Sequence, residues 1–130
     1  MNSGAFAWMV KASTTPSAAT GPISDYSGKG NYLYTEGNFG TAPVSAQLVS
    51  ECVSLVGMTN PVIDFRYYMY GSDIGALAVQ IVPAGSNSWL NVNGNLIANT
   101  SANNHSDAKS AWKYWSINLS NYAGQVIKFR

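Results

Sequence analysis

The side chains of this sequence that could carry out acid–base or metal chemistry are mainly carboxylates. There are six of them: Asp25, Glu36, Glu51, Asp64, Asp73 and Asp107. Two carboxylates held at a fixed separation are enough for glycoside hydrolysis. Asp64 alternates outward beside Arg66, which predicts an exposed ion pair of little energetic weight. Asp73 and Asp107 lie in turn sequences, where aspartate usually bonds to its own backbone.

The remaining three carboxylates, Asp25, Glu36 and Glu51, have two interpretations. A hard cation such as Ca²⁺ takes carboxylate and carbonyl oxygens from loops, so these residues could be its ligands. The alternative is a turn aspartate and two surface carboxylates at strand ends. The residues themselves leave both interpretations open.

Nucleophilic and zinc chemistry find little support in the sequence. It has one cysteine, Cys52, and one histidine, His105. A single Cys and a single His cannot form a zinc site, and one cysteine excludes an internal disulfide. A catalytic triad could recruit His105 and Asp107, but no Gly-x-Ser-x-Gly turn is present to expose a serine. We expect His105 to be a solvated loop residue and Cys52 a small buried hydrophobic residue.

Aromatic side chains at outward or loop positions are the other candidate contact residues. They are Tyr26, Tyr68, Tyr70, Trp89 and Tyr114. Tyrosine and tryptophan combine a large apolar area with a polar end, so such residues could form a flat platform for a sugar or a protein. The alternative is that they pair across strands and pack at the rim of a core.

The charge content excludes several classes of partner. Charged residues make up 10% of the chain and the net charge is +1, with 7 basic residues dispersed along the sequence. Nucleic-acid affinity needs many clustered cations, so we expect no nucleic-acid partner. No apolar stretch approaches the roughly 20 residues that span a bilayer, so we expect no membrane insertion. Residues 5–10 do not resemble a signal peptide, and any export signal would lie outside this sequence.

Alternation of apolar and polar residues predicts β-strands throughout. The clearest run is 62–70, in which alternate residues should face a core: Ile63, Phe65, Tyr67 and Met69. The run 76–82 places Leu77, Val79 and Ile81 inward. A short turn-like segment joins the two runs, which predicts an antiparallel hairpin.

Further strands are predicted over residues 31–36, 47–53, 89–92, 112–119 and 125–130. Residues 93–109 are strongly polar and predict a long exposed loop with at most one short strand near Leu96. No helical periodicity exceeds one turn. The sequence therefore predicts an all-β fold, an antiparallel β-sandwich of jelly-roll type, as a single domain over residues 1–130.

Three motifs in order give the sequence a family resemblance. Residues 21–26 read GPISDY, residues 28–36 read GKGNYLYTE, and residues 65–71 read FRYYMYG. In this order they resemble the MAM domain, the extracellular module of meprins, neuropilins and some receptor tyrosine phosphatases. The resemblance extends from about residue 6 to residue 130. It implies a jelly-roll sandwich that serves adhesion or recognition without catalysis.

The resemblance also carries expectations about a cation and about the branch of the family. Some members bind a cation through the acidic residues of the first two motifs, which here are Asp25 and Glu36. The resemblance therefore implies that these two residues could hold a structural Ca²⁺ or Na⁺. It implies no required cofactor. Vertebrate members have a cysteine where this chain has Val62. Together with the lone Cys52, this resembles a bacterial-type branch without disulfides. The chain also lacks the C-terminal hairpin of other members, so either the sequence is truncated or its sheet is completed in another way. We expect the chain to be part of a larger multidomain protein.

The functional expectation is a non-catalytic, extracellular recognition or adhesion module of a secreted or surface protein. Its expected partners are the other domains of that protein and a glycan or protein ligand. The alternative is a carbohydrate-binding module attached to a secreted glycoside hydrolase or peptidase, because jelly rolls often bind sugars. A small hydrolase that uses carboxylates is the least favoured possibility.

Overall fold

The structure, a computed structural model, describes residues 6–37 and 45–130. Its chain forms two compact units. Unit 1 comprises Met1–Gln47, Arg66–Gly75 and Asn99–Lys113, and unit 2 comprises Leu48–Phe65, Ala76–Ala98 and Tyr114–Arg130. Each unit is assembled from three separate stretches of sequence.

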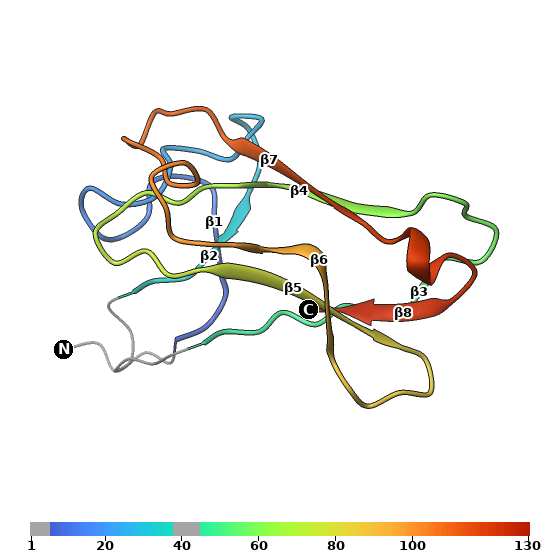
Figure 1. The fold of residues 1–130 in the computed structure, drawn as a ribbon. Coiled ribbons are helices and arrows are strands. Elements are labelled where there is room, and N and C mark those ends of the chain that lie inside the picture. Colours follow the sequence, from blue (N-terminus) through green and yellow to red (C-terminus); the bar gives the residue numbers. More distant parts are fainter. Residues whose placement is uncertain (1–5, 38–44) are drawn as a thin grey trace. The chain divides into compact units, whose positions relative to one another are not determined.

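Unit 2 contains the larger sheet of the fold (Figure 1). Its four strands lie in the order β3-β8-β5-β6. They are β3 (Val53–Ser54), β8 (Val126–Phe129), β5 (Leu77–Pro83) and β6 (Leu90–Ile97). A second sheet pairs β4 (Val62–Tyr67) with β7 (Lys113–Asn118), and a 3-10 turn (Ser120–Tyr122) separates β7 from β8. All pairings with a resolved register are antiparallel.

The core of unit 2 is built by the residues that the alternation predicted. Val79 and Ile81 of β5 and Ile127 of β8 are buried, and they form one cluster with Ile117 of β7. Ile63, Phe65, Trp115 and Phe129 pack against this cluster. Burial of aliphatic side chains from two facing sheets is the main stabilising contribution in a sandwich. The predicted inward faces of these strands and the all-β jelly-roll sandwich are confirmed.

The predicted hairpin between residues 62–70 and 76–82 is wrong. β4 pairs with β7, whereas β5 pairs with β6 and β8. The chain between β4 and β5 therefore passes from one sheet to the other. Alternation determines which face of a strand is buried, but it does not identify the strand's neighbours.

The predicted loop over residues 93–109 is also partly wrong, because β6 continues to Ile97. Ala78 pairs with Leu96 and Gln80 with Asn91, so four residues of β6 lie opposite one residue of β5. Gly94 has φ +74° in this bulge, a backbone conformation that glycine adopts without steric cost. Val92 and Ile97 still reach the core. The bulge interrupts the period of two, so the sequence indicates only two short pieces of β6, one over residues 89–92 and one near Leu96.

Residues 47–53 form less strand than predicted, since β3 begins at Val53. Cys52 is exposed, which contradicts the expectation of a buried cysteine. Val53 is partly buried and packs against the core cluster, so its neighbour Cys52 points the other way, as the alternation of a strand requires.

Unit 1 holds a two-stranded sheet of β1 (Met9–Lys11) and β2 (Tyr32–Tyr34). β1 was not predicted, because three residues are too few to show a period. The buried residues of this unit are mostly aromatic or polar, and include Tyr32, Tyr67, Met69 and His105. Tyr67 and Met69 thus lie inward as predicted.

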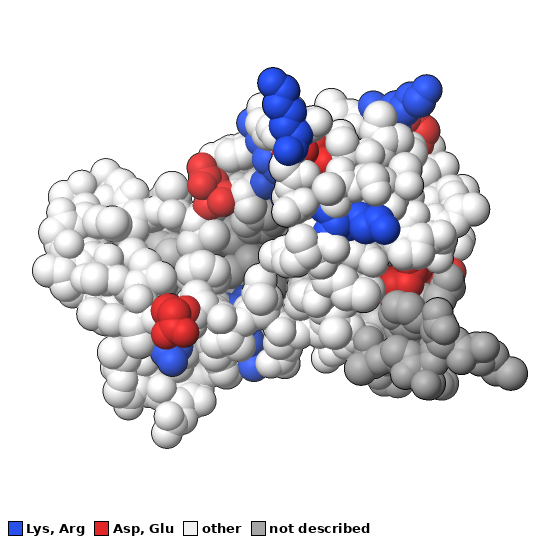
Figure 2. Space-filling model, turned by 180° about the vertical axis from the view of Figure 1, so that it is seen from behind, with Lys and Arg blue, Asp and Glu red and all other residues white. Residues whose placement is uncertain are grey.

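The surface carries few charges, in keeping with the composition. Figure 2 shows a face on which charged side chains stand singly or in small groups among uncharged ones. Serine, asparagine and tyrosine provide most of the remaining polar groups.

Candidate functional site

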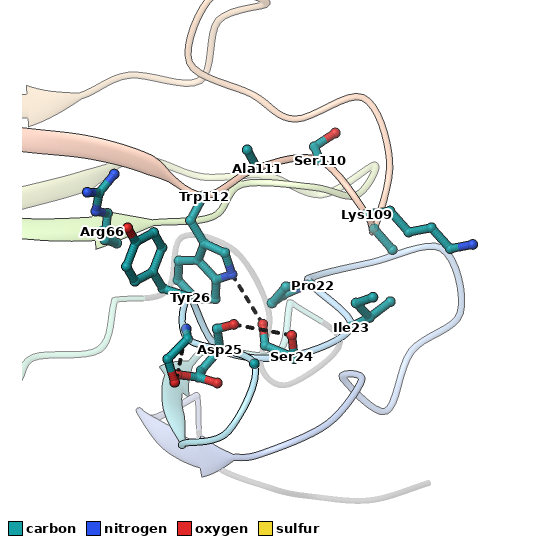
Figure 3. A pocket seen from close by; sticks show the side chains of 13 residues that line it. Pro22, Ile23, Ser24, Asp25, Tyr26, Arg66, Lys109, Ser110, Ala111 and Trp112 are labelled. Atoms are coloured by element: carbon teal, nitrogen blue, oxygen red, sulfur yellow. Dashed lines mark hydrogen bonds between the residues drawn. The ribbon is translucent and has the colours of Figure 1, made fainter.

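A surface pocket of about 480 Å³ lies in unit 1. Two loop segments line it, residues 22–28 and 108–112, together with Arg66 of β4 (Figure 3). We call it the Tyr26 pocket. The Ile23 amide donates to the Ala108 carbonyl at 3.2 Å, so a backbone hydrogen bond joins the two segments.

The Asp25 carboxylate shapes the loop that carries Tyr26. Its Oδ2 accepts from the Ser27 amide at 3.0 Å and from the Ser27 hydroxyl at 2.7 Å. Its Oδ1 accepts from the Gly30 amide at 2.9 Å. These donors, the Ser27 hydroxyl foremost, lower the pKa of Asp25 from 3.8 to about 2. Asp25 is therefore a residue that positions the loop, in agreement with its place in a turn sequence.

Tyr26 itself projects into solvent from this loop. Its side chain is 60% exposed. The guanidinium carbon of Arg66 lies 4.3 Å from the centre of its ring, which is within the range of a cation–π contact. Figure 3 shows Tyr26 beside Trp112, with Arg66 next to the tyrosine ring.

Trp112 forms the inner wall of the pocket. Its indole N–H donates to the Ser24 carbonyl at 3.2 Å. Its ring meets Tyr32 edge-on, with centroids 5.7 Å apart, and lies 5.3 Å from the Tyr68 ring. The same side chain thus lines the pocket and packs into the aromatic core of unit 1.

His105 anchors the segment that leads to Trp112, and it is buried rather than solvated as predicted. Its side chain is 7% exposed and stacks on Tyr68, with centroids 3.9 Å apart. The Met69 amide donates to Nδ1 at 3.0 Å, so Nε2 carries the proton and donates to the Ala111 carbonyl at 3.1 Å. The His105 ring therefore joins the backbone at Met69 to the backbone at Ala111.

Electrostatics keeps this histidine neutral. Burial lowers the pKa of His105 below 6.5, and the nearby positive charge of Lys113 lowers the pKa further. The Lys113 ammonium donates to the carbonyls of Ala102 and Asn104, each at 2.7 Å. The polar segment before Trp112 is therefore held by side chains that bond to its backbone.

Lys109 stands at the rim of the pocket on an aspartate turn. Its amide donates to Oδ1 of Asp107 at 2.7 Å, and the Tyr68 hydroxyl donates to the Asp107 carbonyl at 2.5 Å. The prediction that Asp107 bonds to its own backbone is confirmed. The Lys109 side chain is exposed and points away from the loop in Figure 3.

The five predicted contact aromatics do not share one surface of one unit. Tyr26, Tyr68 and Tyr70 belong to unit 1, whereas Trp89 and Tyr114 belong to unit 2. Tyr68 is half-buried against His105, and Tyr70 is also partly buried. Trp89 is largely covered, with the Arg130 guanidinium 4.5 Å from its ring centre. Of the five, only Tyr26 lines the pocket.

The two predicted cation ligands have protein donors on their carboxylates. Asp25 accepts the hydrogen bonds described above, and Glu36 is 7% exposed with its Oε1 accepting from the Ser17 hydroxyl at 2.9 Å. Among residues 6–37 and 45–130, no group of three or more His, Cys, Asp or Glu side chains is placed to hold a metal ion. A cation would have to compete with these donors for the carboxylate oxygens, so the side chains present do not fit a cation site.

Most residues that line the pocket were not among the predicted site residues, and these include Arg66, Lys109 and Trp112. Arg66 could have been suspected, because it alternates outward at the end of the most regular strand. Trp112 and Lys109 meet the loop at 22–28 only through the fold, so no local pattern marks them.

Comparison with known proteins identifies the family. The model of the family described as MAM domain, meprin/A5/mu, matches residues 1–129. The chain belongs to the MAM family. The resemblance read from the three motifs is thereby confirmed at the level of the family. No solved structure gives a significant match to this chain.

Two neuropilins are among the similar proteins. Neuropilin-1a of Danio rerio is 38% identical over 77 residues, which is 58% of this MAM chain and 8% of the relative. Neuropilin-1 of Xenopus laevis is 34% identical over 62 residues, 48% of the chain and 7% of the relative. The MAM chain thus corresponds to less than a tenth of the length of these relatives.

The described part of this MAM domain offers no membrane-crossing helix, since none of its helices has the necessary length and apolar character.

Proposed function

We propose that this MAM domain is a non-catalytic recognition module of a secreted or surface multidomain protein, and that it contacts a glycan or protein ligand through the Tyr26 pocket. The observation that carries the proposal is the placement of Tyr26. Its ring is largely exposed, yet its loop is fixed by three hydrogen bonds to the Asp25 carboxylate. An exposed aromatic side chain on a rigid loop gives contact area at low entropic cost.

The chemistry around the pocket supports binding rather than catalysis. His105 has both nitrogens bonded to backbone groups, and Asp25 has both oxygens bonded to donors of its own loop. Neither is therefore placed as a general base for the pocket's serine hydroxyls. Membership of the MAM family supports the same interpretation and an extracellular setting.

The test is to compare two exposed tyrosines. The 130-residue chain and its Tyr26→Ala and Tyr114→Ala variants are applied to a panel of immobilised glycans and extracellular matrix proteins. Tyr114 is the matched control, because it is 52% exposed and is not among the residues that line the pocket. We expect Tyr26→Ala to abolish binding to the ligands that the parent chain retains and Tyr114→Ala to preserve it. Equal binding by both variants would exclude the pocket as the contact site.

A second candidate function, a carbohydrate-binding module of a secreted glycoside hydrolase or peptidase, is favoured by a polar row in unit 2. The Arg130 Nε donates to the Gln80 side chain at 2.9 Å, and Gln80 donates to the Asn91 side chain at 2.9 Å. Amide groups ordered in this way can bond to sugar hydroxyls, and Trp89 lies beside them under Arg130. Affinity electrophoresis tests it: retardation by a polysaccharide that Trp89→Ala removes but Tyr26→Ala does not would favour this candidate.

We also propose that the chain represents a bacterial-type branch of the family without disulfides. The support is that its one cysteine, Cys52, has no second cysteine to pair with, and that Val62 stands where vertebrate members have a cysteine. The sequence of the complete protein, with its neighbouring domains, tests this proposal directly.

A further inference from the structure

We propose that the Tyr26 pocket binds a sugar residue that carries a carboxylate, with the ring of the sugar against Tyr26 and its carboxylate at the Arg66 guanidinium. This inference rests on the proposed recognition function of the same pocket, and it adds the chemical class of the ligand.

The charge of the lining residues supports an anionic ligand. The chain has only 7 basic residues, and two of them, Arg66 and Lys109, line this one pocket. The acidic residue in the lining is Asp25, whose two oxygens already accept hydrogen bonds from Ser27 and Gly30. These donors keep Asp25 ionised, since they lower its pKa to about 2. The two cations and one carboxylate of the lining therefore leave a net charge of +1 for an incoming ligand.

The chemistry of Arg66 supports a carboxylate in particular. The guanidinium carbon lies 4.3 Å from the centre of the Tyr26 ring, in the lining of the pocket. The N–H donors of a guanidinium lie in the plane of the group and form a rigid fork. A carboxylate can accept two parallel hydrogen bonds from such a fork, and this pair is among the stronger polar contacts in proteins. Lys109 adds a second positive charge at the rim.

The walls of the pocket favour a sugar over an acidic peptide. Peptides commonly bind by adding a strand to a free sheet edge. Here the walls are two loops, and some of their backbone groups are already occupied, because Ile23 bonds to Ala108 and Ser24 bonds to Trp112. The volume of about 480 Å³ lies within the range of small-ligand sites, roughly 300–1,000 Å³. The exposed Tyr26 ring offers an apolar surface to the C–H face of a sugar.

The experiment is calorimetric titration of the 130-residue chain with five probes. Two are acidic sugars, sialyllactose and a hyaluronan tetrasaccharide, because either sialic or uronic acid would supply the carboxylate. Two are their uncharged counterparts, lactose and diacetylchitobiose. The fifth is a hexaglutamate peptide. We expect at least one acidic sugar to bind about tenfold or more tightly than its uncharged counterpart, as one charge-assisted contact predicts.

Four variants locate the contact. Tyr26→Ala and Arg66→Gln should each weaken acidic-sugar binding about tenfold or more, and Lys109→Gln about two- to fivefold, as for a rim charge. Arg66→Lys, which keeps the charge but loses the fork, should recover only part of the affinity. Tyr114→Ala should have no effect. Circular dichroism of each variant confirms that the fold is retained.

The outcomes separate this inference from the proposed function. If lactose binds as tightly as sialyllactose and Tyr26→Ala abolishes both, the pocket is a recognition site but not an acidic one, and the inference is overturned. Tighter binding of hexaglutamate than of either acidic sugar would overturn it in favour of a peptide. Absence of binding by all five probes would also overturn it, while the panel described under Proposed function would still decide whether the pocket recognises another ligand.

Discussion

His105 should stabilise unit 1 only while its ring is neutral, because its Nδ1 must accept the Met69 N–H. The first perturbation is His105→Ala. It leaves the buried Met69 amide without an acceptor, which costs about 1–3 kcal/mol, and water can replace the partner of the Ala111 carbonyl at a cost of about 1 kcal/mol. Loss of the stack on Tyr68 adds about 0.5–1.5 kcal/mol. We expect a total of about 2.5–5.5 kcal/mol.

A second variant separates the hydrogen bond from the ring. In His105→Asn the side-chain oxygen can occupy the place of Nδ1 and accept from Met69, but the ring is lost. We expect a destabilisation of about 1–2 kcal/mol, clearly smaller than for alanine. Ser106→Ala, at the exposed neighbouring position, should change stability by less than about 0.5 kcal/mol. Urea unfolding followed by tryptophan fluorescence measures all three variants.

The pH dependence gives an independent test. The folded pKa of His105 is lowered below 6.5 by burial and by Lys113. Above pH 6.5 the ring is neutral in both states and its contribution is complete. As pH falls below 6.5, the unfolded chain binds a proton that the folded chain resists, so stability decreases until the folded pKa is reached. The titratable groups facing the ring are Tyr67, Tyr68, Asp107 and Lys113.

The measurement is the free energy of unfolding at about pH 7.5 and about pH 5.5. His105 is the only histidine, so the parent chain should lose stability at the lower pH and His105→Asn should lose less. Two results would refute the reasoning: the same pH dependence in both proteins, or a cost of His105→Ala below about 1 kcal/mol.

The remaining predictions concern four other features. The folded pKa of Asp25 is lowered from 3.8 to about 2, so its carboxylate stabilises the fold fully above pH 3.8 and this contribution is lost as the pH falls to about 2. Asp25→Asn should therefore lose less stability over this pH range than the parent chain. Thermal unfolding across the range measures this, and equal losses in the two proteins would contradict it. Because the Asp25 and Glu36 carboxylates already accept hydrogen bonds from protein donors, neither chelator nor added Ca²⁺ should change the melting temperature; an increase with Ca²⁺ that chelator reverses would contradict this. Ile117→Ala should cost about 2–5 kcal/mol in urea unfolding, whereas Ile117→Val should cost about 0.5–1.5; equal costs would show that the side chain is not packed in the core. The Cys52 thiol is exposed, so it should react with a disulfide reagent without denaturant, at a rate close to that of the unfolded chain.

Strand faces were predictable from sequence because burial repeats every two residues along a strand. Ile63, Ile81 and Ile127 face the core as the pattern required. Strand partners were not predictable, and β4 and β5 join different sheets although a short turn-like segment joins them. Pairing depends on contacts between residues far apart in sequence, which a local pattern does not contain.

The candidate site shows the same limit. Asp25 and Tyr26 were identified in advance, since an aspartate turn and a loop aromatic are local features. Trp112 was not, because its role depends on a hydrogen bond to Ser24, 88 residues away in the chain. His105 was misjudged for a related reason: in a polar segment a histidine normally faces water, and only the tertiary structure places the Met69 amide against it.

The Trp112 side chain lines the pocket and also packs edge-on against the buried Tyr32. The wall of the pocket therefore cannot move without opening the aromatic interior of unit 1. The conformational entropy of ordering this wall is lost during folding, before any ligand arrives. Association should consequently resemble the meeting of two rigid bodies, with its rate set by diffusion and orientation. A bound ligand should also slow hydrogen exchange at Tyr32, a residue that it does not touch.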